Sequence, residues 1–437
     1  MSQPYNVGDP TAPVAPTGLI STAQPIAGEP PTSPPASKAT LPAILMSSFT
    51  LFATYAGLIA ILLPSQVLLL DEANKVANLA IVTTVSFVFT LFAQPIVGAL
   101  SDRTRSKLGR RAPWMLIGAF VGGILLLGMG SLTSLFWITV FWVIIQVALN
   151  AIQGPLSAIT PDRFPRDKRG TASAISGIGM QLGGTVGVIS AGALAASLGL
   201  AYAVFGIVVM VVTVIFVLIN RDWSSKDAAV DPWSWKTFLS GFWVSPKRHP
   251  DFAWAFAARF LLILGYFVVA AFQLYLLTDF IGMPLAEAQG AVITLTLVAF
   301  VPTLVAIAVS GWWSDKAGRR KVFIYAASVV MVVGLSMPLM MPNMTGMIAM
   351  SIINGFGFGL YMSVDAALMT EVLPGGGAAA GKDLGILNIA TNIPQALSPA
   401  IAGLIITYFG GYSMLFVFAI VFSIIAALAI IPIKSVR

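Results

Sequence analysis

The sequence predicts an all-α membrane protein with twelve transmembrane helices in two pseudo-symmetric six-helix bundles. Of the 437 residues, 57% are hydrophobic and only 9% are charged, whereas a soluble domain carries about 25% charged residues. Twelve apolar segments have about the 20-residue length that a helix needs to cross a bilayer. One basic motif also recurs at equivalent points of two halves. Much of the surface must therefore face lipid.

The predicted spans divide the chain into two halves. In chain order they are 42–64, 77–100, 114–131, 135–158, 171–196, 200–220, 252–280, 288–312, 322–341, 344–368, 383–407 and 411–433. The proline-rich segment 1–40 cannot bury enough apolar area to offset its ordering entropy, so we expect a disordered tail. The polar linker 221–251 then separates the bundles 41–220 and 252–437.

The basic residues predict how the chain lies in the membrane. If the N-terminus is cytoplasmic, the inside segments hold all of the 24 Lys and Arg residues except Lys75 and Arg259. Cytoplasmic loops carry the excess of Lys and Arg in membrane proteins. We therefore expect a multi-pass protein of the inner (cytoplasmic) cell membrane with both termini inside. The lipid bilayer, and not nucleic acid, then accounts for the net charge of +7.

The residues of enzyme, metal and nucleotide sites are missing from the sequence. It has no cysteine, and its one histidine, His249, lies in the polar linker. The glycine-rich runs "GIGMQLGGTVG" and "INGFGFGLY" lie within spans and lack the Lys-Ser/Thr ending of a phosphate-binding loop. Small residues in a span instead favour close helix packing. We expect no catalytic residues, no metal and no cofactor.

Two basic stretches, "SDRTRSKLGRRAPW" at 101–114 and "SDKAGRRK" at 314–321, mark an internal repeat. Asp102 and Asp315 each follow the second span of their half, and "LGRRAPW" then matches "AGRRKVF". Further on, "TPDRFP" and "TEVLP" each follow a fourth span. A parallel repeat of six spans is typical of secondary transporters.

The same stretches resemble the signature loop of the major facilitator superfamily, G-x-x-x-D-x-x-x-G-R-R/K. It occurs as "GALSDRTRSKLGRR" and again as "SGWWSDKAGRR". The longer form, together with "PDRFP" and "GKDLGILNIA", is similar to the sucrose-transporter-like and glycoside–pentoside–hexuronide:cation symporter branch. The resemblance covers nearly all of 41–437, and it implies the major facilitator fold and transport by alternating access.

The resemblance also implies a role for the two basic loops. Such loops latch the cytoplasmic ends of helices while the transporter faces outward. An aspartate can cap a helix N-terminus, and arginine clamps a carboxylate in a fork geometry that lysine cannot match. A pure topology signal would explain the arginines but not the paired aspartates. We assign to gating Asp102, Arg103, Arg110, Arg111, Asp315, Arg319 and Arg320.

Polar side chains within the spans are candidates for a substrate site near the midplane. In the fourth span Gln146, Asn150, Gln153 and Ser157 share one helical face. Amides and phenols beside aromatic rings suit a neutral polyhydroxylated ligand. The alternative is that these groups only hydrogen-bond between neighbouring helices. The candidate substrate-binding residues are Gln146, Asn150, Gln153, Tyr266, Gln273, Asn354, Tyr361, Asn388 and Asn392.

Arg259 and Asp365 are the charges that the predicted spans place well within the membrane. A buried charge needs a partner, so we expect the two to meet. Asp365 would take up a proton when substrate binding separates it from Arg259. The alternative is a permanent structural ion pair. The first two spans contain no Asp or Glu, unlike sodium-coupled members of the sugar branch. This difference favours protons or uncoupled flow.

These observations predict a monomeric transporter of a neutral sugar or glycoside, driven by proton symport. A proton-coupled exporter of drugs or metabolites on the same fold is the alternative. The fifth span, "SGIGMQLGGTVGVISAG", lacks the proline of the antiporter signature, which weakens this alternative. A static receptor or scaffold would gain nothing from two gating motifs.

Overall fold

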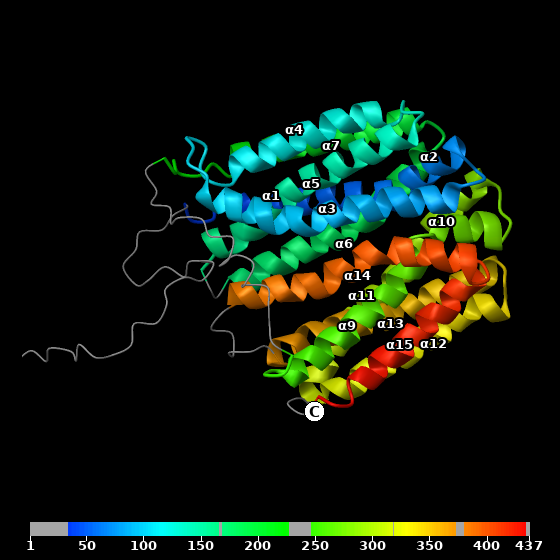
Figure 1. Ribbon diagram of the computed structural model, residues 1–437. Helices are drawn as coiled ribbons and strands as arrows, with labels where there is room; N and C mark the ends of the chain where they lie inside the picture. The colour runs from blue at the N-terminus through cyan, green and yellow to red at the C-terminus, as the bar shows by residue number, and fades with distance from the viewer. Residues whose placement is uncertain (1–33, 166–167, 227–245, 318, 373–379, 434–437) are drawn as a thin grey trace, which may run out of the picture.

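The computed structural model describes residues 34–165, 168–226, 246–317, 319–372 and 380–433. Within these ranges every regular element is a helix. The predicted tail 1–40 lies mostly outside the described residues, as do 227–245 of the predicted linker. Figure 1 shows the helices running roughly side by side along the length of the molecule.

The helices of the first half follow the six predicted spans. The first is a continuous column whose middle winds as one π-helical turn. The bounds are α1 (Thr40–Gly57), η1 (Leu58–Leu62), α2 (Leu63–Leu70), α3 (Lys75–Arg103), α4 (Ala112–Met129), α5 (Leu135–Arg163), α6 (Arg169–Leu194) and α7 (Leu198–Ile219).

The second half repeats this order, beginning with a column in three pieces. The bounds are α9 (Pro250–Ala270), α10 (Gln273–Tyr275), η2 (Leu276–Phe280), α11 (Leu285–Ala317), α12 (Arg320–Met340), α13 (Met344–Val372), α14 (Ala380–Tyr408) and α15 (Ser413–Ala429). The seventh span, predicted over 252–280, is interrupted, because the α-helix stops at Ala270 and resumes at Gln273. Each predicted span otherwise coincides with a helix, so the predicted all-α membrane fold is confirmed.

The packing of the helices is the same in both halves. In the first, α1 packs against α6, α3 against α5, and α4 against both α5 and α7. The corresponding contacts in the second are α9 with α14, α11 with α13, and α12 with both α13 and α15. Between the halves, α3 packs on α14 and α6 packs on α11. Equivalent helices thus make equivalent contacts in the two halves, as expected of two six-helix bundles related by a two-fold pseudo-symmetry.

The glycine-rich runs serve helix packing. A Cβ atom on Gly183 of α6 would lie 2.2 Å from the carbonyl oxygen of Phe49 on α1, and one on Gly187 would lie 2.1 Å from that of Ala53. In the second half a Cβ atom on Gly359 of α13 would lie 2.5 Å from the carbonyl oxygen of Thr303 on α11. Such approaches exclude any side chain, as small-residue interfaces between membrane helices do.

The two ends of the molecule differ in how the halves meet. We call the end that carries the loop 104–111 the basic end, and the end that carries 71–74 and 281–284 the far end. One hydrophobic core joins the first half to the far-end part of the second half, and α2 and α10 lie at this same end (Figure 1). A second core, which includes Phe252, Ile324 and Leu368, contains residues of the second half alone. The two halves therefore share a core at the far end, although the first-half part of that core, which includes Met115 and Phe164, continues toward the basic end.

Candidate functional site

A buried ion pair joins α9 and α13 in the second half. Nη1 of Arg259 lies 2.5 Å from Oδ2 of Asp365, and the side chains are only 12% and 4% exposed. The hydroxyl of Tyr361, one turn earlier on α13, donates to the other carboxylate oxygen at 2.9 Å. The structure thus brings together the two charges that the sequence predicted to meet, and it adds Tyr361 to them.

Arg259 is also tied to a third helix. Its Nε and Nη2 atoms donate to Oγ1 of Thr391 on α14, at 3.2 and 2.8 Å. The guanidinium therefore bridges a carboxylate and a hydroxyl with one planar fork, which a lysine could not do. Sequence analysis missed Thr391, because a threonine inside a span carries no distinctive signal. Its neighbour Asn392, a predicted ligand, is half-buried at the next position.

Two aromatic rings stack on the faces of α9 and α13 that also carry Arg259 and Asp365. Tyr266 and Phe358 lie 4.1 Å apart between ring centroids, with an angle of 14° between planes. Tyr266 follows Arg259 by seven residues, and Phe358 precedes Asp365 by seven. Seven residues make about two helical turns, so the stack lies about 10 Å from the ion pair toward the far end.

The polar stripe of α5 lies opposite an exposed apolar face of the same helix. Ile144, which is 39% exposed, and Trp137, which is 52% exposed, mark the outward face of this helix. Gln153 lies nine residues beyond Ile144, which is two and a half turns, so it points the opposite way. Gln146 and Asn150 are buried, whereas Gln153 is half-buried. The stripe therefore becomes more accessible toward the basic end.

The structure also shows what some stripe residues bind. The Nδ2 atom of Asn150 donates to the backbone oxygen of Gln146 at 2.8 Å, and the hydroxyl of Ser157 donates to that of Gln153 at 2.9 Å. Both bonds stay within α5. The bond of Asn150 uses only the Nδ2 atom of its side-chain amide, and the side-chain oxygen Oδ1 takes no part in it.

The remaining predicted ligands do not join the cluster around Arg259. Asn354 is buried beside Gly334 of α12, where a glycine Cβ would lie 3.0 Å from its Cγ. That position favours packing between α12 and α13. Gln273 is half-buried in the short helix α10, near the far end. The side chain of Asn388 lies outside the described residues.

A second charged cluster lies at the basic end, inside the first half. Asp102 in the last turn of α3 pairs with Nη1 of Arg111 at 2.6 Å. Nε of Arg111 lies 3.1 Å from Asp162 near the end of α5, and Arg110 lies 3.6 Å from the same carboxylate. Burial alone would lower the pKa of Arg111, but Asp162 and Asp102 together raise it above its ordinary value. Arg111 stays charged and fastens α3 to α5.

The possibility that Asp102 caps a helix is not realised. Arg111 occupies the N-cap position of α4, and no side chain caps that helix. Asp102 stands instead at the C-terminal end of α3, where a helix dipole disfavours an anion. Arg111 offsets that cost. Arg103 is half-buried in the same turn.

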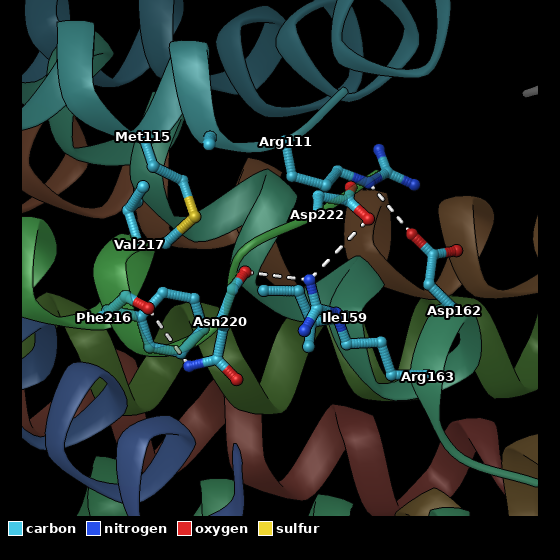
Figure 2. Close-up of a pocket in the computed structure, with 10 residues that line it drawn as sticks. Arg111, Met115, Ile159, Asp162, Arg163, Phe216, Val217, Asn220 and Asp222 are labelled. Carbon is cyan, nitrogen blue, oxygen red and sulfur yellow. Dashed lines mark hydrogen bonds and ion pairs between the residues drawn. The ribbon is translucent and has the colours of Figure 1, made fainter. Parts of the chain in front are cut away.

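Asp162 and its neighbours line a small pocket next to this cluster, shown in Figure 2. Nη2 of Arg163 donates to the backbone oxygen of Asn220 at 2.8 Å and lies 3.7 Å from Asp222. The Nδ2 atom of Asn220 donates to the backbone oxygen of Phe216 at 3.1 Å. These contacts hold the end of α7 against α5. The "PDRFP" motif contains Asp162, but the pairing of Asp162 and of Asp222 was not predicted, because it depends on the fold.

The matching loop of the second half is only partly described. Arg319 is exposed at the N-cap of α12, and Arg320 is half-buried in its first turn. The side chain of Asp315 lies outside the described residues. Within the described part of the chain, no three His, Asp or Glu side chains gather as a metal site would require.

This architecture and sequence are similar to those of known transport proteins. The family model described as MFS/sugar transport protein matches residues 74–433. Two sucrose transport proteins of Arabidopsis thaliana match shorter segments. SUC3 is 32% identical over 126 aligned residues, and the match covers 24% of this chain and 21% of that protein. SUC4 is 35% identical over 101 aligned residues, and the match covers 19% of this chain and 20% of that protein. The matched segments thus span about a fifth of these relatives.

Solved structures show the same fold at low identity. A bacterial homolog of the human lysosomal transporter Spinster, in an inward-facing and occupied conformation, has a TM-score of 0.69 at 16% identity. It covers 91% of this chain and 97% of its own. The nucleoside transporter NupG has a TM-score of 0.71 at 16% identity, covering 90% and 99%. These relatives are transporters, and the predicted superfamily resemblance is confirmed. The chain belongs to the MFS/sugar transport protein family.

Proposed function

We propose that the chain is a secondary active transporter that carries a neutral sugar or glycoside by proton symport with alternating access. It works as a monomer in the inner membrane of the cell, with the basic end in the cytoplasm. The distribution of Lys and Arg supports this orientation, because cytoplasmic loops carry the excess of these residues. The sucrose transport proteins among its relatives support the class of substrate.

The buried cluster of Arg259, Asp365, Tyr361 and Thr391 carries the proposal. Its ion pair is almost fully withdrawn from solvent, and Asp365 already uses both oxygens. A proton on Asp365 would remove its charge and weaken its hold on Arg259. The freed guanidinium donors would then need other acceptors, because an unpaired buried charge is costly. Sugar hydroxyls can supply these acceptors, which couples the proton to the substrate.

The surroundings suit a neutral, polyhydroxylated ligand. The stacked rings of Tyr266 and Phe358 offer an apolar face two turns from Arg259. From the first half, the amides of α5 can donate to and accept from hydroxyl groups without adding charge. We assign to substrate contact Gln146, Asn150, Gln153, Tyr266, Tyr361 and Asn392, with Gln273, Asn354 and Asn388 as outlying candidates.

The clusters at the basic end serve gating in this proposal. Asp102, Arg111 and Asp162 make the ends of α3, α4 and α5 one rigid unit. A unit of this kind can tilt as a whole when the basic end opens or closes. Arg103, Arg110, Asp315, Arg319 and Arg320 complete the two loops to which we assign this role.

Uptake into proteoliposomes tests the proposal. Labelled mono- and disaccharides are offered outside vesicles with an acidic exterior, with a sodium gradient, or with neither. We expect saturable uptake that the proton gradient drives above equilibrium and that a protonophore returns to equilibrium. A sodium gradient without a pH difference is the matched control and should give no accumulation. Absence of saturable sugar uptake, together with proton-driven expulsion of an apolar cation, would establish the exporter alternative instead.

A further inference from the structure

A charged contact joins the two halves at the far end. Nζ of Lys75, the first residue of α3, lies 2.6 Å from Oδ1 of Asp279 in η2, and the side chains are 11% and 26% exposed. The hydroxyl of Tyr412, at the start of α15, donates to the other oxygen of Asp279 at 2.6 Å. Both carboxylate oxygens are thus engaged: Oδ1 by Lys75 of the first half and by the hydroxyl of Thr278 at 2.9 Å, and Oδ2 by Tyr412 of the second half.

Further contacts surround this ion pair and also join the two halves at the same end. Nζ of Lys75 lies 5.4 Å from the centroid of the Tyr275 ring, which is within the range of a cation–π contact. The hydroxyl of Tyr275 donates to the backbone oxygen of Pro64 at 2.9 Å. On the neighbouring helix, Nε2 of Gln289 donates to Oγ of Ser65 at 2.9 Å. Pro64 and Ser65 belong to α2, whereas Tyr275 and Gln289 belong to the second half.

Close backbone approaches accompany these bonds. A Cβ atom on Gly403 of α14 would lie 2.8 Å from Cβ of Ala80 on α3. One on Gly192 of α6 would lie 2.5 Å from the side chain of Ile293 on α11. Gly192 and Gly403 both stand near the far end of their helices. The halves are therefore sealed together there by apolar contact as well as by polar bonds.

The distribution of charge makes this contact unusual. The predicted topology leaves Lys75 as the one lysine or arginine in the loops of the far end. Its side chain is nevertheless buried, and its partner comes from the other half. A lysine needed only for solubility would extend into water. One buried to reach an aspartate of the opposite half contributes to how the halves sit together.

We propose that Lys75, Asp279 and Tyr412 form a gate that holds the far end closed. They act as positioning residues, because they set which end of the molecule is open and need not touch the substrate. For the far end to open, α3 and η2 must separate, so Asp279 must leave Lys75, whereas its bond to Tyr412 lies within the second half. The π-helical turn that carries Asp279 precedes Gly282, whose φ of +83° suits a glycine.

This proposal rests on the alternating access of the proposed function, but not on the substrate or the coupling ion. A permanent clasp is the competing explanation of the same contacts. The two differ in one respect. Removing a permanent clasp lowers stability, whereas removing a gate contact changes how often each end is open. A ligand-free measure of accessibility separates these outcomes.

The chain has no cysteine, so one introduced thiol reports on one position without background. Ser65→Cys places the thiol in α2 at the sealed contact with Gln289, where the serine is fully buried. Labelling with a membrane-impermeant maleimide applied to the far end is followed over time. We expect Lys75→Met and Asp279→Asn, each in this background, to raise the labelling rate about tenfold, as loss of a charge-assisted bond predicts. Tyr412→Phe removes only one neutral donor and should raise it less.

Two further variants complete the test. The exchanged pair Lys75→Asp with Asp279→Lys should return the labelling rate toward that of the parent. An exposed thiol on the polar stripe of α5, Ser157→Cys, should be labelled from the basic end more slowly in Lys75→Met, because the populations shift away from that opening. Unchanged labelling at both thiols in correctly folded Lys75→Met, Asp279→Asn and Tyr412→Phe would overturn the gate. Sugar uptake could still be normal in that case, so the proposed function would survive.

Discussion

The charged groups at the two ends of this molecule are organised differently. Among the ion pairs seen between described residues, those at the basic end and in the interior join residues of one half, such as Asp102 with Arg111 in the first and Arg259 with Asp365 in the second. At the far end Lys75 of the first half binds Asp279 of the second. Pairs within a half can persist through a rigid-body tilt, whereas a pair across the halves must break and re-form. By this difference we distinguish ion pairs that hold helices together within a half from the pair that we propose as a gate between the halves.

The core packing agrees with this division. The far-end part of the second half shares one hydrophobic core with the first half, but the core that surrounds Tyr361 and Leu368 belongs to the second half alone. A separation of the halves at the basic end would therefore divide neither core, whereas a separation at the far end would divide the shared core. The following predictions test whether the contacts within and across the halves really differ in this way.

The largest effect is expected for Asp365→Asn. The amide keeps the size of the carboxylate and can still accept a bond from Arg259, but it cannot take up a proton. We expect concentrative uptake to be abolished while exchange of substrate down its own gradient stays measurable. Counterflow in proteoliposomes without a pH gradient provides that second readout. Accumulation against a gradient by this variant would show that Asp365 is not the coupling group and that the pair is structural.

A matched pair of glycine substitutions contrasts packing within and between halves. In Gly183→Ala the new methyl group would lie 2.2 Å from the backbone oxygen of Phe49, inside the first half. Overpacking of this kind costs about 1–3 kcal/mol of stability. In Gly403→Ala the methyl group meets Ala80 across the halves. We expect thermal unfolding in detergent to show a lower midpoint for Gly183→Ala and a smaller change for Gly403→Ala.

The same pair has a second expected difference. Gly403→Ala should increase maleimide labelling of the Ser65→Cys thiol from the far end, because crowding there favours separation of the halves. Gly183→Ala should leave that labelling as it is. Equal effects of both variants on labelling and on stability would contradict the proposed difference between packing within a half and packing between the halves.

A smaller effect is expected for Asp102→Asn. The side chain is 41% exposed, and Arg111 keeps Asp162 as a second partner. An exposed ion pair contributes only about 0–1 kcal/mol, so folding and insertion should be preserved. Transport should slow, because the ends of α3 and α5 are held less firmly. Turnover equal to that of the parent, measured at saturating substrate, would remove Asp102 from the gating unit.

The sequence predicted the fold more fully than the site. Twelve spans, two halves and their repeat all depend on hydrophobic length and on a duplicated motif, which are local properties. The breaks at Ala271 and Phe272 escaped prediction because both residues are apolar. The meeting of Arg259 with Asp365 could be predicted because buried charges require partners.

What was missed depends on tertiary contact. Thr391 is ordinary in sequence, and becomes notable only where Arg259 of another helix reaches it. The "PDRFP" motif contains Asp162 but does not show that Arg111 is its partner. Lys75 resembles a simple loop charge, because nothing in the surrounding residues shows that Asp279 lies opposite. Asn354 resembles a ligand, but the glycine facing it on α12 lies far away in the chain.

The smallest expected effect concerns Asn150 on α5. Its Nδ2 atom binds the backbone oxygen of Gln146 within the same helix, so its removal breaks no bond between helices. We therefore expect Asn150→Ala to leave thermal stability close to that of the parent. If the amide oxygen meets a substrate hydroxyl, the apparent KM for sugar should rise about tenfold, which corresponds to about 1.4 kcal/mol for one lost polar contact. Ser157→Ala is the matched control, since its hydroxyl also binds a backbone oxygen of α5 but lies nearer the basic end. A KM unchanged in Asn150→Ala, together with a lowered unfolding temperature, would show that the residue stabilises the bundle and contacts no substrate.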